Sequence, residues 1–311
     1  MLQLNEAQID RIISMDVAIE AMRDLLHRTR RNQIEVLPRR RLEDGDMYLA
    51  TMASVDRASH LFSAKLYTTG ARRGSFKLFL WNSRTGALLG MFDANRLGQL
   101  RTGAMSAVAT DIMARKDAAT LLLVGTGFQA ETQALALSRV RRIEQIWVYS
   151  RNAANREHFV HRIQSHLPQA IAINSVDNVE PYARQADLIV TATTARTPVI
   201  HGAWLKPGVH LNAVGSNHPE HAEVDSETFA RASAIATDHI EGARIESGDL
   251  LLGLAEEQWS RVTPLALQPS RTDPNAISIF VSQGIESEDL VLAEYVLRRW
   301  VEEKGGPEYE S

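Results

Sequence analysis

The segment from Leu121 to Leu137 restricts the possible folds of this chain more than any other part of the sequence. It reads LLLVGTGFQAETQALAL: four apolar residues run into a glycine turn, and a helical pattern follows at once. A buried strand, a glycine turn and a helix in this order are typical of the first unit of a dinucleotide-binding sheet. An ordinary strand-to-helix turn is the alternative interpretation.

The small residues of this turn each have a physical task in binding a dinucleotide. Gly125 allows the tight turn, Gly127 lets the backbone approach the phosphates, and Ala130 lets the helix pack close to its strand. The N-terminus of the helix then offers free N–H groups and the positive end of the helix dipole to the pyrophosphate. We therefore predict that a dinucleotide binds at this turn.

The second half of the chain continues in a strand–helix rhythm. The strand-like segments after the turn are IWVYS, IAINS, DLIVTAT, HLNAVG and AIATD, with helical patterns between most of them. Together with LLLVG they predict an α/β fold of the Rossmann type. In such a doubly wound parallel sheet the ligand binds at the carboxyl ends of the strands.

The first half of the chain has a different texture. Asn5 and Ser14 are the expected N-caps of two helices. Residues 34–92 alternate in short strand-like segments, separated by turns such as DGD and SRTG. Consecutive strands without intervening helices predict an antiparallel sheet in an α+β domain. A helix over about residues 98–115 then leads into the second half.

These patterns predict two domains. Residues 1–115 form a substrate-binding α+β domain, and residues 116–286 form an NAD(P)-binding Rossmann domain. The last segment, residues 287–304, reads SEDLVLAEYVLRRWVEEK and predicts a long amphipathic helix that begins at a capping Ser287. We expect this helix to return to the first domain.

Composition excludes several classes of function. A net charge of -4 over 311 residues does not favour nucleic acid or an anionic membrane as partner. The absence of cysteine excludes disulfides, thiolate nucleophiles and zinc–thiolate sites. The first residues lack the apolar region of a signal peptide, and no apolar run approaches the ~20 residues of a membrane span. We therefore expect a soluble cytoplasmic protein.

The residues after the second strand of the Rossmann domain indicate which cofactor is preferred. An acidic residue about 20 positions beyond the glycines would bind a ribose 2′-hydroxyl and favour NAD. This strand instead ends in Ser150, Arg151 and Asn152. The planar guanidinium of Arg151 suits the 2′-phosphate of NADP. We predict NADP(H) as the favoured cofactor and NAD(H) as the alternative, unless Arg151 is only a solvated surface residue.

Two isolated basic residues are candidates for chemistry. Lys65 interrupts the strand LFSAKLYT, and a lysine in a cleft can bind a carboxylate or, with a lowered pKa, exchange a proton with an amine or imine. An exposed strand lysine is the alternative. Arg101 lies among small residues in LRTGAMSAVA, which indicates close packing around a charge that needs a partner. A substrate carboxylate, a cofactor phosphate or an internal salt bridge would each serve.

Two further clusters are less specific. Arg39, Arg40 and Arg41 form a basic run typical of a solvated hairpin, in which one arginine can face the cleft. His218 and His221 have the spacing of metal ligands, but they follow a strand end and no third ligand is evident. We therefore predict no metal site.

Taken together, these segments resemble the ornithine cyclodeaminase/mu-crystallin family over nearly the whole chain. The specific feature is the combination of RTGA, VGTGFQA and NAVGS at these separations. Other matching pieces are FSAKLYT, GALLGMFDAN, WVYSRN, DLIVTATTARTPVI and SIFVSQGIESEDL. The resemblance implies a two-domain protein whose first domain also forms the interface of a homodimer. It further implies activity on α-amino acids or their imines with NAD(H) or NADP(H).

The resemblance also implies roles for individual residues. Lys65 is the catalytic lysine near the substrate carboxylate and the reacting nitrogen, Arg101 binds the carboxylate, and Arg39 is a further carboxylate contact. The residues implied to bind the cofactor are Thr102, Gly125, Gly127, Phe128, Gln129, Ala130, Ser150, Arg151, Asn152, Thr191, Ala192, Thr193, Val214, Gly215 and Gly284.

Two positions depart from the family pattern. Cyclodeaminases carry an aspartate shortly after the NAVG strand that activates the side-chain amine for ring closure, and this chain has Asn217 there. Because an amide is not a general base at neutral pH, ornithine cyclisation is disfavoured, whereas hydride transfer is unaffected. Asp225 lies further on, at a position that the family shares more generally. Gly98 stands where many members have threonine, which would enlarge the cleft or change a substrate contact.

We therefore predict an NAD(P)-dependent reductase of cyclic or linear ketimines, or equivalently an amino-acid dehydrogenase, that acts by hydride transfer. The alternatives are an ornithine cyclodeaminase, which forms proline and ammonia, a non-catalytic NADPH-dependent binding protein, and a non-redox lyase. The side chain of the substrate is not defined by the sequence.

Overall fold

The computed structural model describes residues 1–70 and 74–304. The chain divides into two compact units: unit 1 is Met1–Arg101 with Gly284–Ser311, and unit 2 is Thr102–Gln283. The first boundary falls inside helix α3 (Asn95–Met113), rather than after it near residue 115 as the sequence analysis places it. A continuous helix carries no turn residues, so a boundary within it leaves no signal in the sequence.

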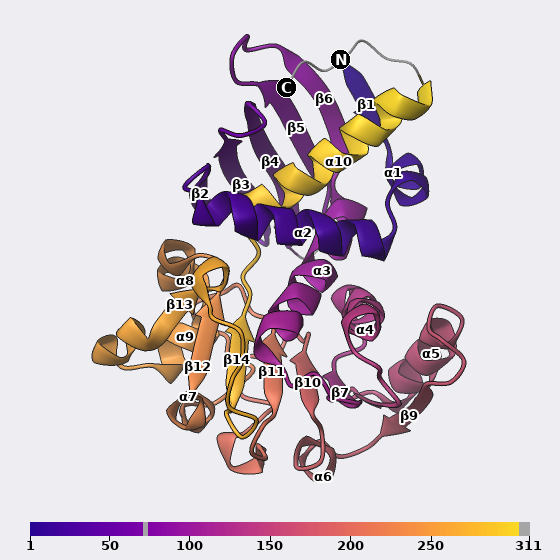
Figure 1. Cartoon of the computed structure of the whole chain (residues 1–311), viewed down its shortest axis with the longest axis vertical. Coiled ribbons are helices and arrows are strands. Elements are labelled where there is room, and N and C mark those ends of the chain that lie inside the picture. Colours follow the sequence, from indigo (N-terminus) through magenta and orange to yellow (C-terminus); the bar gives the residue numbers. More distant parts are fainter. Residues whose placement is uncertain (71–73, 305–311) are drawn as a thin grey trace. The chain divides into compact units, whose positions relative to one another are not determined.

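Unit 1 is built on a six-stranded sheet in the order β1-β6-β5-β4-β3-β2 (Figure 1). The neighbours from β2 to β6 are antiparallel as predicted, but β1 pairs with β6 in parallel. Three residues are too few for β1 to show a period, so this strand was not predicted. The strands are β1 (Leu2–Leu4), β2 (Ile34–Asp44), β3 (Met47–Asp56), β4 (Leu61–Gly70), β5 (Phe76–Asn82) and β6 (Leu88–Asp93).

The first helices of unit 1 begin at the two predicted N-caps. Asn5 accepts the backbone N–H of Gln8 at the start of α1 (Glu6–Ile12). Ser14 accepts the N–H of Val17 at the start of α2 (Met15–Arg30). Each cap satisfies an N–H that has no partner within the helix, so the helix start is fixed by local sequence.

Helices cover one face of the unit 1 sheet, and no described helix covers the other. In β3 and β4 alternate residues are buried, and the residues between them are half-buried or exposed. Helix α10 (Glu286–Lys304) contacts β2 to β5 and also α2, and both helices cross the same face in Figure 1. The predicted last helix is therefore present, but it begins at Glu286, so Ser287 lies in its first turn and is not its cap.

Unit 2 contains an eight-stranded parallel sheet in the order β13-β12-β14-β11-β10-β7-β8-β9 (Figure 1). The six predicted strands are β7 (Thr120–Val124), β8 (Gln145–Tyr149), β9 (Ala172–Val176), β10 (Leu188–Thr191), β11 (His210–Ala213) and β12 (Ala234–Thr237). The strands β13 (Val262–Pro264) and β14 (Ser278–Val281) were not predicted. β13 has only three residues and ends in proline. β14 is as long as the predicted strands β10 to β12, and its apolar run SIFV was overlooked.

The helices of unit 2 follow its strands. The α-helices are α4 (Phe128–Val140), α5 (Ala153–Gln164), α6 (Glu180–Ala183), α7 (Ser226–Arg231), α8 (Ile240–Glu246) and α9 (Gly248–Gly253). Short 3₁₀ helices are η1 (Gly202–Trp204), η2 (Glu256–Arg261) and η3 (Leu265–Leu267). No helix in the described part of the chain has the length and apolar content needed to cross a bilayer.

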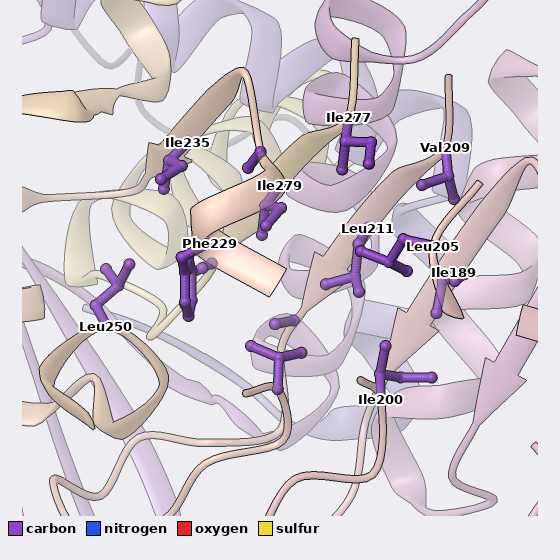
Figure 2. Close-up of a cluster of buried hydrophobic side chains, with 14 of the residues drawn as sticks. Ile189, Ile200, Leu205, Val209, Leu211, Phe229, Ile235, Leu250, Ile277 and Ile279 are labelled. Atoms are coloured by element: carbon purple, nitrogen blue, oxygen red, sulfur yellow. The ribbon is translucent and has the colours of Figure 1, made fainter. Parts of the chain in front are cut away.

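Both faces of the parallel sheet are buried. Leu121 and Leu123 of β7 lie in one apolar cluster with the small residues of α4. Leu122 and Val124 lie in the other cluster, together with the isoleucines and the phenylalanine labelled in Figure 2. Burial on two sides explains why these strands read as continuous apolar runs, and it fixes the strand ends that carry the loops.

Candidate active site

A cavity of about 650 Å³ in unit 2 lies at the carboxyl ends of β7, β8 and β10. Strands β8 and β9 lie on one side of β7, whereas β10, the next strand along the chain, lies on its other side. The strand order therefore reverses between β7 and β10. Doubly wound sheets bind ligands at such a switch point, and the volume is in the usual range for small molecules. The wall consists of Val124, Gly125, Thr126, Gly127, Tyr149, Ser150, Arg151, Asn155, Ala192, Thr193, Thr194, Ala195, Arg196, Thr197 and Val199.

The glycine turn in this wall has the geometry that a pyrophosphate requires. Gly125 has φ +119°, and a Cβ there would lie 2.3 Å from the carbonyl oxygen of Ala192. A Cβ on Gly127, by contrast, would meet nothing within 4 Å. Gly127 is also the N-cap of α4, and no side chain caps this helix. A helix N-terminus without a side-chain cap, next to a glycine with open space around it, suits an anion, so the turn fits a dinucleotide.

The cavity brings together six of the residues implied to bind the cofactor: Gly125, Gly127, Ser150, Arg151, Ala192 and Thr193. Arg196 and Asn155 also line it and were not predicted. Arg196 comes from the loop after β10, where the sequence offers only a polar run, TTART. The cavity thus has two arginines in its wall.

The other residues implied to bind the cofactor do not line this cavity. Ala130 is buried in the core beneath α4, and Asn152 caps α5 by accepting the N–H of Asn155 at 3.0 Å. Gly284 belongs to unit 1. Thr191 and Gly215 instead donate to a buried carboxylate. The remaining residues outside the wall are Thr102 in α3, Phe128 and Gln129 in the first turn of α4, and Val214 after β11.

The buried carboxylate is Glu223, which ties together the ends of β10 and β11. It accepts hydrogen bonds from Thr191 Oγ1 at 2.8 Å, from Thr193 N at 2.7 Å and from Thr193 Oγ1 at 2.6 Å. The N–H of Gly215 donates to it at 2.7 Å. Burial raises the pKa of Glu223, and these donors act against that rise. The sequence analysis did not single out Glu223, so its role in holding the cavity wall was missed.

The loop after β11 contains the other polar residues that the sequence analysis discussed. The rings of His218 and His221 lie 5.1 Å apart. Within residues 1–70 and 74–304, no three side chains that ligate metals come together. Asn217 lies in the same loop. Asp225 caps α7, since it accepts the N–H of Thr228 at 2.9 Å.

Unit 1 contains a separate, buried charge cluster at Lys65 and Arg101. Lys65 points from the helix-covered face of β4 and is 3% exposed, so it is not an exposed strand lysine. Its Nζ donates to Asp289 Oδ1 at 2.8 Å. Arg101 Nε is 3.4 Å from the other oxygen of Asp289, and Arg101 Nη1 donates to Glu288 Oε2 at 2.7 Å. Asp289 of α10 therefore links the two basic residues, and Arg101 makes an internal ion pair.

Arg39 is also buried in this unit, which corrects the expectation of a solvated hairpin. Residues 39 to 41 lie within β2, and the β2–β3 pairing shifts register between Leu37 and Arg40. With this shift Arg39 is buried, whereas Arg40 is exposed. Arg39 Nη2 donates to the carbonyl oxygen of Gly284 at 3.2 Å. The sequence pattern could not show a bulge, because a single inserted residue leaves the alternation of the strand locally unreadable.

Gly284 lies against both arginines. Its φ is +71°, and a Cβ on it would lie 2.2 Å from Arg101 Nη1. Only glycine fits at this point, between the guanidinium of Arg101 and the hydrogen bond from Arg39. The resemblance assigned Gly284 to the cofactor, whereas its contacts in unit 1 are with the two arginines implied to bind the substrate carboxylate.

Burial shifts the pKa of two groups in this cluster. It lowers the pKa of Lys65, and the charge of Asp289 opposes that change. Glu286 accepts hydrogen bonds from Ser54 and Ser63, and burial raises its pKa to about 8. A lysine whose pKa moves toward neutrality can give and take a proton under physiological conditions, while the arginines remain cations.

The acidic residues of α10 were the part of this cluster that sequence analysis missed. Glu286, Glu288 and Asp289 are all buried. Acidic residues in the first turn of a helix usually face water, and their charge interacts favourably with the positive end of the helix dipole. The sequence shows three acidic residues close together but not that they are buried. Their burial becomes evident only when the start of the helix is seen to pack against the basic residues.

A doubly wound parallel sheet with a phosphate-binding turn, in one chain with a buried lysine–arginine cluster, defines a dinucleotide-dependent oxidoreductase of two units. Comparison with known proteins is more specific. The chain belongs to the ornithine cyclodeaminase/mu-crystallin family, whose model matches residues 1–304.

Individual relatives align with most of the length of this chain. Delta(1)-pyrroline-2-carboxylate reductase of Bacillus cereus is 33% identical over 241 residues, which are 75% of this chain and 73% of the relative. Ketimine reductase mu-crystallin of the mouse is 29% identical over 262 residues, covering 81% of this chain and 80% of the relative. Delta(1)-pyrroline-2-carboxylate reductase of Thermococcus litoralis, solved in complex with NADH and L-proline, has a TM-score of 0.92 and 28% identity. That match covers 97% of this chain and 98% of the solved one.

Proposed function

We propose that the protein is an NAD(P)H-dependent reductase of ketimines that carry a carboxylate on the imine carbon, and that in reverse it oxidises the corresponding amino acid. The observation that carries the proposal is the buried Lys65, paired with Asp289 in the same cluster as Arg101. Relatives named for pyrroline-2-carboxylate reduction and ketimine reduction support the same reaction. Cyclic imino acids such as 1-pyrroline-2-carboxylate are therefore the first candidates for the substrate.

The residues of unit 1 supply binding and proton transfer. Arg101 and Arg39 hold the substrate carboxylate, for which planar guanidinium groups are well suited. Lys65, with its lowered pKa, gives a proton to the imine nitrogen as the C=N bond is reduced. A bound dihydronicotinamide supplies the hydride for the imine carbon. In the reverse direction Lys65 takes the proton back from the amine.

We further propose NADP(H) as the favoured cofactor. Arg151 lies in the cavity wall directly after β8, where a ribose 2′-phosphate is recognised in this fold. Arg196 in the same wall adds a second cation. The wall residues include no acidic side chain. Such a side chain would bind the ribose 2′-hydroxyl and favour NAD.

Ornithine cyclodeamination is the weaker candidate for this chain. The reaction needs a base to activate the side-chain amine, and Asn217 stands where the family resemblance places an aspartate. Its amide does not take up a proton at neutral pH. Asp225 is no substitute, because it is engaged in capping α7.

The open face of the unit 1 sheet supports a homodimer as the active form. Phe62 is 47% exposed, Leu49 40% and Leu66 39%, all on the face without helices. Phe79 and Trp81 stack on the same face at 5.9 Å between ring centroids. An apolar sheet face of this kind is covered by a partner in most proteins, and the family resemblance makes a second copy of this chain the expected partner.

The proposal is tested with a substrate panel followed by NADPH and NADH absorbance. The panel contains 1-pyrroline-2-carboxylate, 1-piperideine-2-carboxylate, pyruvate with methylamine, and ornithine. We expect NADPH oxidation with the cyclic imines and formation of the corresponding saturated cyclic amino acids, such as proline from 1-pyrroline-2-carboxylate. Proline and ammonia from ornithine without net change in the cofactor would replace the proposal with cyclodeamination. Tight NADPH binding without turnover on any compound would indicate a binding protein.

A further inference from the structure

Gly98 lies in α3 directly opposite the charged end of Lys65. A Cβ built on Gly98 would lie 3.1 Å from Lys65 Nζ and 3.8 Å from Asp289 Oδ1. Leaving aside Leu97, Gln99 and the backbone of its own helix, these are the only described atoms within 4 Å of that point. A Cβ at 3.1 Å would press on the ammonium of Lys65, so the missing side chain leaves the charged end of Lys65 its room beside Asp289.

The helix itself has no need of a glycine at this position. The N–H of Gly98 donates to the carbonyl of Ala94 at 3.1 Å, as in any regular helix. Glycine in a helix is destabilising relative to alanine, because the unfolded chain is more flexible. The contrast with Gly103 of the same helix is clear, since a Cβ there would lie 2.6 Å from the backbone oxygen of Thr132. Gly103 is explained by close backbone packing, and Gly98 is not.

The ammonium of Lys65 has hydrogen-bonding capacity beyond its ion pair. It carries three N–H donors, and within the described residues it makes one hydrogen bond, to Asp289. The centroid of the Phe76 ring lies 5.9 Å from Nζ, and the ring accepts no conventional hydrogen bond. A buried ammonium needs further acceptors, and the nitrogen of an imine substrate is one.

We propose that Gly98 is a specificity-determining position of the reductase. Its lack of a side chain lets the imine nitrogen and the ring carbon next to it reach Lys65, and the size of residue 98 sets the largest ring that the enzyme accepts. This inference rests on the proposed function, since it concerns the ring that carries the reacting nitrogen.

The test compares Gly98→Ala and Gly98→Val with wild type on five-membered and six-membered cyclic imines. One added methyl group in a fitted site changes kcat/KM by roughly 10-fold or more. We expect Gly98→Ala to lose about that much with 1-pyrroline-2-carboxylate, to lose more with 1-piperideine-2-carboxylate, and to keep its NADPH affinity. Its Tm stays equal or rises, because alanine favours the helix. Gly98→Val deepens both losses; if it does not fold, the alanine variant alone decides.

The matched control is Gly242→Ala in α8, where a Cβ would make ordinary contact with His239 at 3.4 Å. We expect it to leave both kcat/KM values unchanged. Equal kcat/KM for wild type and Gly98→Ala on both rings would overturn the inference, and so would an equal loss on both rings or a fall in Tm with loss of NADPH binding. Wild-type enzyme that reduces no imine at all would instead defeat the proposed function.

Discussion

Two opposing effects act on the pKa of Lys65, which pairs with Asp289. Burial of the side chain favours the neutral amine, while the carboxylate 2.8 Å away favours the ammonium. A residue held between these states can exchange a proton without a large change in free energy. The same residue at the surface would stay protonated and would be a poor proton donor to an imine.

Replacing Lys65 by alanine tests this role directly. Loss of a general acid or base lowers rates by roughly 10²- to 10⁴-fold, so kcat/KM of Lys65→Ala for cyclic imines falls by at least that range. NADPH affinity, measured by fluorescence titration, stays unchanged, because the cavity residues belong to unit 2. Lys116→Ala serves as control, since its side chain is 75% exposed. Turnover retained in Lys65→Ala is incompatible with the proposed chemistry.

Arg151 is the residue that we expect to set cofactor preference. In Arg151→Asp the carboxylate repels a 2′-phosphate and accepts from a 2′-hydroxyl, so the ratio of kcat/KM for NADPH to that for NADH falls by about 10-fold or more. Steady-state kinetics with both cofactors measure this ratio. Arg142→Asp, at a side chain that is 93% exposed, controls for a general change in surface charge. If both variants keep the wild-type ratio, Arg151 does not read the phosphate.

The elements differ in how well local sequence predicts them. Strand β7, the turn after it and α4 were predicted because three signals follow one another in neighbouring residues: the apolar run, the positions of the glycines and the helical period. Strand β13 has three residues and no period, so only the sheet that buries it defines it as a strand. Strand β14 has the same length as the predicted strands β10 to β12 and was overlooked.

The residues of the candidate site also differ in how well the local sequence predicts them. Lys65 and Arg101 stand out in the sequence as lone charges among small or apolar residues. The partners of these two residues lie on α10, more than half the chain away, so only tertiary structure brings Asp289 to them. The contacts of Glu223 and Gly284 could not be predicted for the same reason, because they come from elements that are distant in sequence.

The start of α9 predicts how stability depends on pH. Asp249 accepts the N–H groups of Glu223 and Val224 through one oxygen. Burial and the nearby charge of Glu223 raise its pKa to about 7. Because the folded state then keeps a proton that the unfolded chain loses near pH 4, the free energy of unfolding declines as pH rises from about 4 to about 7 and then levels off.

Asp249→Asn removes this titration and keeps the accepting oxygen. We expect the variant to be more stable than wild type at pH 8 by about 1–2 kcal/mol and to lose part of the decline between pH 4 and 7. Urea unfolding at a series of pH values measures both effects. Asp249→Ala is the contrasting variant, since it leaves two buried N–H groups without their acceptor and lowers stability at every pH. Identical pH profiles for wild type and Asp249→Asn would show that Asp249 is ionised in the folded state.

At the scale of the whole molecule, the unit 1 sheet has a face that the described chain does not cover. The pairing places Phe62 beside Val55 and Trp81, and Ala64 beside Ala53 and Phe79, so the apolar residues form continuous rows across strands. A stable protein–protein interface buries about 1,200–2,000 Å² in total, so a dimer contact would extend over several strands of this six-stranded sheet. Because the same strands carry Lys65 on their other face, a dimer contact would stiffen the strand that positions it.

We therefore expect Phe62→Asp to convert the proposed dimer into a monomer. A carboxylate in the centre of an apolar interface loses its hydration without gaining a partner, so the molar mass from light scattering after gel filtration halves. Far-UV circular dichroism and NADPH binding stay as in wild type, because Phe62 is 47% exposed within one chain and supports no core. Leu267→Asp in unit 2, at a residue 63% exposed, is the matched control and stays dimeric. A monomeric wild type, or a dimeric Phe62→Asp, would place the subunit contact elsewhere or remove it, and would leave the apolar rows of this sheet without an occupant.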